Sequence, residues 1–265
     1  EVLGRQVGGR IVASAQTDRF DAVFTGHIPV GPGFWSSSLV PPPPPLLPLL
    51  GEMRPFFLET GSQFRPGPPP EFGSPEFLVA LGEVRQISDT RTDEQLRIGR
   101  FWALATGTLV AGYWNEQAEA LIDRDGLSER DAAHAFALVN MAAMDANIAC
   151  HDAKYVYWFI RPTKADPGIT LIPQDGDLVA VGLPNHPSYP SNHACVSGAA
   201  SVVLGGIFPS DSHRLFALGR EAGISRLYAG LHYRFDMEAG FDIAANVVAL
   251  ARERDPAAGQ PFPMR

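Results

Sequence analysis

Three short segments of the chain carry residue types that can bind and attack a negatively charged group. Each segment by itself has an ordinary structural explanation, since Arg-Pro often ends a helix and Pro-Ser often begins one. Together they supply three cations, a hydroxyl, two histidines and a carboxylate, a set that suits a phosphate-shaped anion. The segments are KYVYWFIRP (154–162), PSNH (190–193) and SRLYAGLHYRFD (225–236).

The cations of the first and third segments are unusual for this chain. Its 21 basic residues are 19 arginines plus Lys154 and Lys164. An ammonium kept inside an aromatic helix favours a bound oxyanion, because burying an unpaired charge is costly. Lys154 and Arg161 are seven residues apart, which would be two turns of one helix with both cations on one face. Arg226 adds a planar guanidinium that can hold two anion oxygens.

The second and third segments predict an anion cradle beside an oriented histidine. Ser191 precedes an apolar run, so its hydroxyl and the backbone amides of Asn192 and His193 are expected at a helix N-terminus, where anions bind. His232 and Asp236 are four residues apart, which is one helical turn. The carboxylate would then fix the imidazole tautomer and raise the basicity of the ring.

In this order and with these internal spacings, the segments resemble the type 2 phosphatidic acid phosphatase and vanadium haloperoxidase superfamily. The wider resemblance is to soluble bacterial vanadium-haloperoxidase-like proteins. It takes in QFRPGPPP (63–70), DTRTDEQ (89–95) and HPSYPSNH (186–193). The resemblance implies a helical bundle whose oxyanion is bound by Lys154, Arg161, Arg226, the Ser191 hydroxyl and the Asn192 amide.

The resemblance also implies roles for the histidines. His232 would be the apical ligand of the vanadium in vanadate, or the nucleophile toward phosphorus, with Asp236 supporting it. His193 would be the general acid or base. At Asn192 the superfamily usually has glycine, so the asparagine side chain either crowds the pocket or adds a hydrogen bond to it.

Two enzymatic activities fit these residues. Phosphoryl transfer passes through a five-coordinate arrangement, and histidine-bound vanadate adopts the same arrangement stably, so one pocket suits both. A vanadium-dependent haloperoxidase, which oxidises a halide with hydrogen peroxide, is favoured. His186 lies where bromoperoxidases of the superfamily have an extra histidine and chloroperoxidases have phenylalanine. It is therefore a candidate halide or supporting residue and favours bromide over chloride. The long proline-rich N-terminal segment also resembles the haloperoxidase-like branch.

Two alternatives remain open at this point. The first is a soluble acid phosphatase, which needs no cofactor and hydrolyses phosphate monoesters through a phosphohistidine at His232, with His193 protonating the leaving oxygen. The second is an oxyanion-binding helical protein without turnover, for which Asn192 is the only sequence argument.

The elements that must position these residues are helices. Apolar spacing and start signals predict them, and strand alternation is scarce. Thr92 with Gln95 and Ser128 with Asp131 have capping-box spacing. We therefore expect one all-α domain over 1–265, a bundle (74–265) preceded by an N-terminal helix and an irregular proline-rich wrapping segment (1–73). The helices are expected over 1–17, 74–87, 92–122, 128–158, 192–207, 211–228 and 236–252.

The composition of the chain limits the classes of binding partner that are expected. The 265 residues carry 29 acidic and 21 basic side chains, a formal charge of -8. This balance argues against nucleic acid and anionic membranes, and the longest apolar stretches fall short of the roughly 20 residues of a membrane helix, so a soluble chain is expected. Small-molecule substrates are expected, while oligomeric state is open. The chain begins at Glu1, so a removed signal is compatible with it, and a secreted or periplasmic location is favoured. Cys150 and Cys195 are expected as buried thiols.

Overall fold

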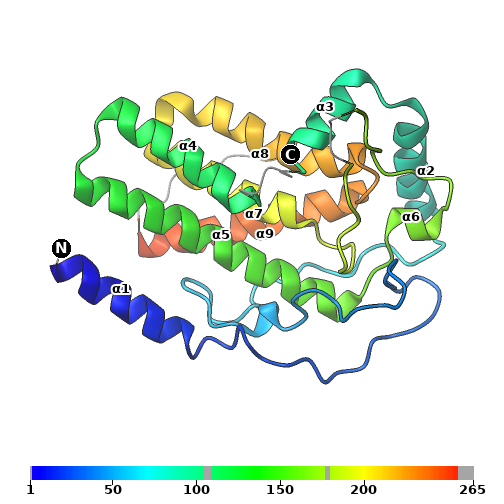
Figure 1. The fold of residues 1–265 in the computed structure, drawn as a ribbon, viewed down its shortest axis with the longest axis horizontal. Helices are drawn as coiled ribbons and strands as arrows, with labels where there is room; N and C mark the ends of the chain where they lie inside the picture. Colours follow the sequence, from blue (N-terminus) through cyan, green and yellow to red (C-terminus); the bar gives the residue numbers. More distant parts are fainter. Residues whose placement is uncertain (1, 104–108, 177–179, 256–265) are drawn as a thin grey trace.

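The computed structural model describes residues 2–103, 109–176 and 180–255, which form helices and no strand (Figure 1). Phe34 and Phe159 form an isolated bridge. The all-α class predicted from the sequence is therefore confirmed. The helices are α1 (Val2–Ala15), α2 (Pro75–Thr90), α3 (Asp93–Phe101), α4 (Leu109–Asp125), α5 (Glu129–Tyr157), α6 (Pro162–Ala165), α7 (Asn192–Ile207), α8 (Ser212–Tyr228) and α9 (Arg234–Arg254), with single 3₁₀ turns at Leu50–Glu52 and Pro209–Asp211.

Helix α7 is the centre of the bundle. Twelve of its sixteen residues are buried, and it packs against α5, α8 and α9. Small residues allow this close packing: a Cβ added to Gly198 would come within 2.8 Å of the Ala244 side chain on α9. In Figure 1, α4, α5, α8 and α9 run beside α7 along the long axis, and α2 and α6 lie at one end. The apolar core of α4, α5, α7, α8 and α9 thus holds the N-terminus of α7 in a fixed place.

The capping signals place several helix starts correctly. The Thr92 hydroxyl accepts the N–H of Gln95 and the Gln95 side chain returns to Thr92, a complete capping box. Ser128 caps α5 by accepting the N–H of Asp131. The single helix expected over 92–122 is wrong, because α3 ends at Phe101 and α4 begins at Leu109. Trp102 follows α3 with its ring fully buried and its Nε1 2.9 Å from a Glu221 oxygen. The part of that prediction at 104–108 lies outside the described residues.

The segment between α1 and α2 wraps the bundle through backbone contacts. The buried carboxylate of Asp145 on α5 accepts the N–H groups of Phe56, Phe57 and Leu58 at 2.6–2.9 Å. Trp35 and Phe57 are buried, whereas Phe34, Leu46 and Phe56 stay more than 40% exposed, so only part of the predicted aromatic packing occurs. A proline-rich chain without periodicity is thus held by polar anchors as much as by apolar ones.

Helix α1 forms as predicted, but it buries none of its residues. Its apolar side chains Leu3, Val7 and Ile11 are all more than half exposed. Among the described residues, no helix combines the length and hydropathy needed to cross a bilayer.

Candidate active site

The predicted site residues come together at the end of the bundle where α5 ends and α7 and α9 begin. The N–H of Ser191, just before α7, donates to the carbonyl of Asp236 in the first turn of α9 at 2.8 Å. The Lys154 ammonium, near the end of α5, donates to the carbonyl of Pro190, next to Ser191. Three helix ends therefore meet at one place.

Lys154 lies in the last turn of α5 and is fully buried. Its Nζ also donates to the carbonyls of Pro187 and Ser188 at 3.0 and 2.8 Å. These residues belong to the loop that leads into α7. The ammonium therefore holds this loop against α5 from inside the protein.

Arg161 reaches the same place by a different route from the one predicted. Helix α5 ends at Tyr157, and Trp158 adopts a left-handed conformation (φ 49°), so Lys154 and Arg161 do not share two turns of one helix. Arg161 instead precedes the short helix α6. Its Nη1 donates to the carbonyl of Leu231 at 2.7 Å and to His232 Nε2 at 3.0 Å. The turn at Trp158 aims the guanidinium back into the bundle.

Arg226 and His193 meet at the C-terminal end of α3. Arg226 Nη2 donates to the carbonyl of Gly99, and His193 Nε2 lies 2.8 Å from the carbonyl of Trp102. A carbonyl oxygen only accepts, so the proton of His193 is on Nε2 and its Nδ1 carries the lone pair. Backbone carbonyls at the end of α3 thus position Arg226 and His193, which are both predicted site residues.

Ser191 stands at the N-terminus of α7 with an unused hydroxyl. The residue is fully buried, its side chain makes no capping hydrogen bond, and its Oγ has no partner in the described part of the chain. A buried hydroxyl without a partner is costly. The helix end also presents unpaired N–H groups and a positive dipole. Both features suit an anion bound at this point.

The structure fixes the tautomer of His232. Its Nδ1 lies 2.7 Å from Asp236 Oδ2, and its Nε2 receives the N–H of Arg161. The proton is therefore on Nδ1 and the lone pair on Nε2, as a metal ligand or nucleophile requires. The predicted one-turn spacing on a helix is wrong, because His232 precedes α9 and Asp236 lies in its first turn. The pair forms across a helix start instead.

Ser188 completes this arrangement and is not among the predicted site residues. Its hydroxyl donates to Asp236 Oδ2 at 2.5 Å, and the N–H of Tyr233 donates to the same oxygen at 3.2 Å. Burial raises the pKa of Asp236 to about 6, although the Ser188 hydrogen bond acts in the opposite direction. No spacing signal separates Ser188 from an ordinary loop serine, since its partner is 48 residues away.

The three buried cations lack carboxylate partners. In the part of the chain that the structure describes, none of Lys154, Arg161 and Arg226 forms an ion pair. Burial lowers the pKa of Lys154 to about 8, of Arg161 to about 10 and of Arg226 to about 9. Each shift shows that the charged form is disfavoured by desolvation. A bound anion would relieve all three at once.

The histidines around these cations are held neutral. Burial, followed by the nearby cations, lowers the pKa of His186, His193 and His232 well below the usual range. His186 Nδ1 lies 3.1 Å from Arg161 Nη2 and 3.0 Å from the carbonyl of Pro187. The structure therefore places the predicted His186 against the predicted Arg161. His151, one turn before Lys154 on α5, lies with its ring 6.0 Å from that of His186.

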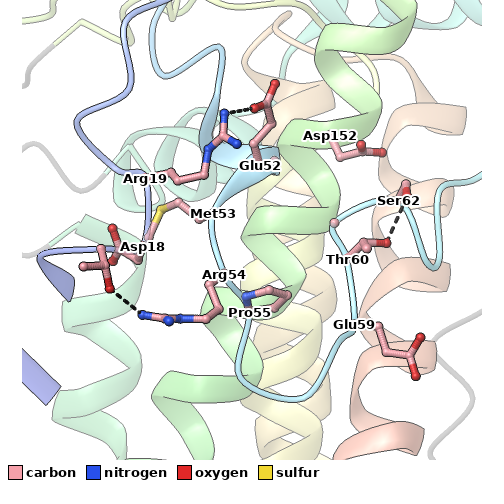
Figure 2. A pocket seen from close by; sticks show the side chains of 13 residues that line it. Asp18, Arg19, Glu52, Met53, Arg54, Pro55, Glu59, Thr60, Ser62 and Asp152 are labelled. Carbon is pink, nitrogen blue, oxygen red and sulfur yellow. Dashed lines mark hydrogen bonds and ion pairs between the residues drawn. The ribbon is translucent and has the colours of Figure 1, made fainter. Parts of the chain in front are cut away.

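A separate hollow on the surface holds none of the predicted site residues. It has a volume of about 460 Å³ and lies between the wrapping segment and α5 (Figure 2). Its side chains are mainly those of the wrap, including Arg19, Glu52 and Arg54, with Asp152 from α5 on the other side. Arg19 and Glu52 pair with each other there. This hollow lacks the buried histidines and cations described above.

The comparisons with known proteins agree with this chemistry. A family model described as the PAP2 superfamily matches residues 134–256. Over 188 residues the chain is 31% identical to a non-specific acid phosphatase of Providencia stuartii, covering 69% of this chain and 70% of that protein. The chain belongs to the PAP2 superfamily. A further non-specific acid phosphatase, of Salmonella typhi, is 32% identical over 41% of this chain and 42% of its own length.

Solved structures extend the similarity of this PAP2 protein to its N-terminal segment. A bacterial vanadium-dependent iodoperoxidase superposes with a TM-score of 0.77 and 27% identity, covering 95% of this chain and 67% of its own. A bacterial vanadium-dependent chloroperoxidase shares the fold (TM-score 0.66, 15% identity, 88% and 65% coverage). The PAP2 protein is thus an enzyme of the group that contains acid phosphatases and vanadium haloperoxidases.

Proposed function

We propose that the protein is a vanadium-dependent haloperoxidase that oxidises a halide, bromide rather than chloride, with hydrogen peroxide. The observation that carries this proposal is the set of three buried cations without carboxylate partners around the unpartnered Ser191 hydroxyl and His232. The similarity to the iodoperoxidase, which includes the wrapping segment, supports this choice. His186, at the position where bromoperoxidases of the superfamily have a histidine, supports bromide, and it lies against Arg161.

The residues fit vanadate. Lys154, Arg161 and Arg226 would hold its oxygens together with the Ser191 hydroxyl and the Asn192 amide, and His232 Nε2 would be its protein ligand. When bound, vanadate supplies the Lewis acid at which hydrogen peroxide is activated. The donor set is a set for oxygen anions, since every one of these groups except His232 donates a hydrogen bond.

The chain's own residues have separable tasks in this proposal. Asp236 holds the proton of His232 at Nδ1 and so leaves the lone pair on Nε2, which accepts an N–H of Arg161 in this structure. The three cations neutralise the charge of the bound oxyanion. His193 keeps its own proton on Nε2 through the Trp102 carbonyl, so its Nδ1 can accept a proton from a substrate.

The second candidate function is an acid phosphatase, which the 31% identity to the Providencia stuartii protein favours. In this reaction His232 Nε2 would form a bond to phosphorus while the ester P–O bond breaks. His193 would first take a proton at Nδ1, because its Nε2 proton is held by the Trp102 carbonyl, and would then give that proton to the leaving oxygen. Water would then release phosphate and free His232. The same cations and hydroxyl would bind the three phosphate oxygens.

One parallel assay separates the two functions. We expect vanadate-loaded protein to brominate a dye with peroxide and bromide, and vanadate-free protein to do so at no measurable rate. Aryl-phosphate hydrolysis that is inhibited by vanadate would instead establish the phosphatase. In either reaction His232→Ala should reduce turnover by about a thousandfold or more. His27→Ala, at an exposed histidine of the wrap, is the matched control. Equal turnover by His232→Ala would contradict both functions.

A further inference from the structure

The side chain of Asn192 is fixed between two helices at the rim of the anion site. Asn192 is the first residue of α7, and its Nδ2 donates to Asn147 Oδ1 on α5 at 2.6 Å. The same Nδ2 lies 3.3 Å from Nδ1 of His151, one turn further along α5. The amide group is therefore held by its nitrogen, and its orientation is set.

The oxygen of the same amide has no partner. Asn192 Oδ1 is buried and accepts no hydrogen bond from the part of the chain that the structure describes. The nearest imidazole nitrogen does not serve it, because His151 Nδ1 faces Asn192 Nδ2 and accepts from it. A buried amide oxygen without a donor destabilises the fold. The neighbouring residue, Ser191, carries the other unpartnered oxygen of this helix start.

Asn192 lies at the helix end where the anion is proposed to bind. Side chains of an α-helix lean toward its N-terminus, so the first residue of α7 leans over the helix end where Ser191 and the free N–H groups lie. Most other protein groups there donate hydrogen bonds: the cations, the serine hydroxyl and the backbone amides, whereas His193 Nδ1 and His232 Nε2 carry lone pairs. Asn192 Oδ1 is different, because it can only accept.

We propose that Asn192 makes the site selective for a tetrahedral oxyanion that carries a hydroxyl group. Its Oδ1 accepts the O–H of hydrogen phosphate or of a protonated vanadate, whereas a fully deprotonated anion such as sulfate presents only oxygens that repel it. This inference rests on the proposed function, in that it assumes the anion binds at α7. It assigns to Asn192 a contact that a glycine at the same position lacks.

The test compares inorganic phosphate with inorganic sulfate by titration calorimetry at about pH 6, where phosphate retains a proton and sulfate has none. We expect the wild-type protein to bind phosphate more tightly than sulfate. The measured quantity is the dissociation constant for sulfate divided by that for phosphate. Asn192→Ala and Asn192→Gly should each lower this ratio about tenfold, mainly because phosphate binds more weakly. Asn147→Ala, which frees the amide nitrogen, should lower the ratio by a smaller factor.

Asn140→Ala is the matched control. Asn140 lies two turns before Asn147 on the exposed side of α5 and pairs with Asn115. Its variant should keep the wild-type ratio, and thermal melts should show all variants folded at the temperature of the titration. An unchanged ratio in folded Asn192→Ala and Asn192→Gly would overturn the inference alone. Failure of the wild-type protein to bind either anion would overturn the proposed function as well.

Discussion

Two fully buried carboxylates have different roles, Asp145 in the middle of α5 and Asp236 in the first turn of α9. Asp145 uses both oxygens, since Oδ1 accepts one backbone N–H and Oδ2 accepts two. Asp236 crowds three donors onto Oδ2 and leaves Oδ1 without a partner among the described residues. Burial raises the pKa of both.

The difference separates an anchor from a site. The hydrogen bonds of Asp145 join only parts of this chain, and they hold the wrapping segment to the bundle. The polar groups around Asp236 are not all paired within the described part of the chain. Asp236 Oδ1 and Ser191 Oγ have no hydrogen-bond partner, and the three buried cations have no carboxylate partner. Native proteins satisfy nearly all buried polar groups. Where several unsatisfied groups gather, they point to a missing ligand.

The largest expected effect tests the anchor. Asp145→Ala leaves the N–H groups of Phe56, Phe57 and Leu58 without an acceptor, which should lower the free energy of unfolding by about 3 kcal/mol. Urea unfolding followed by circular dichroism measures this change. Asp145→Asn keeps acceptor capacity and should lose less. Phosphate binding by the folded Asp145→Ala protein should match the wild type, and a large loss of binding would show that the anchor also shapes the site.

The next effect tests the site. Lys154→Met removes a buried cation, so phosphate should bind about fiftyfold more weakly, corresponding to about 2.3 kcal/mol, the size of a hydrogen bond to a charged group. The free energy of unfolding of the phosphate-free protein should change little, because the loss of the three hydrogen bonds to loop carbonyls offsets the removal of a buried charge without a carboxylate partner. Lys164→Met is the control, because Lys164 is the other lysine and is exposed. Wild-type phosphate affinity in Lys154→Met would remove Lys154 from the site.

The helices and the residue types of the candidate site could be predicted from the sequence, but the way they meet could not. Apolar periodicity and caps are local, so α7 was predicted with its observed bounds, Asn192–Ile207. The helical spacing argument for Lys154 and Arg161 fails because Trp158 turns the chain in a left-handed conformation, which nothing in its residue type requires. Lys154 and Arg161 therefore reach the same site from α5 and from the start of α6, and not from two turns of a single helix.

Hydrogen-bond partners that are far apart in the chain could not be predicted from the sequence either. Asp145 reads as one polar residue on a largely apolar helix, and its three partners are backbone groups 87–89 residues away. The contacts of Arg226 and His193 at α3 are backbone carbonyls too, which carry no residue-type signal. The free thiols Cys150 and Cys195 are buried, as expected for residues without a bridging role.

The smallest expected effect is a pH dependence that distinguishes the site from the anchor. Burial lowers the pKa of Lys154 to about 8 in the phosphate-free protein. Below this pH the ammonium is already charged and phosphate affinity should be nearly constant. Above it, binding must first return a proton to Lys154, so affinity should fall by about tenfold per pH unit, and more steeply above about pH 9, where Arg226 also loses its proton. Calorimetry from about pH 7.5 to 9.5 measures this limb.

The variants make this limb specific to Lys154. Lys154→Arg should move the fall in affinity to higher pH, since a guanidinium holds its proton more strongly. Asp145→Asn should leave the limb in place, because the anchor contributes no group that faces the anion and no proton that titrates in this range. A limb that stays near pH 8 in Lys154→Arg would assign it to another group. The pH dependence would then no longer distinguish Asp236, which lies among the anion-binding groups and has an unpaired oxygen, from Asp145, whose two oxygens are both paired.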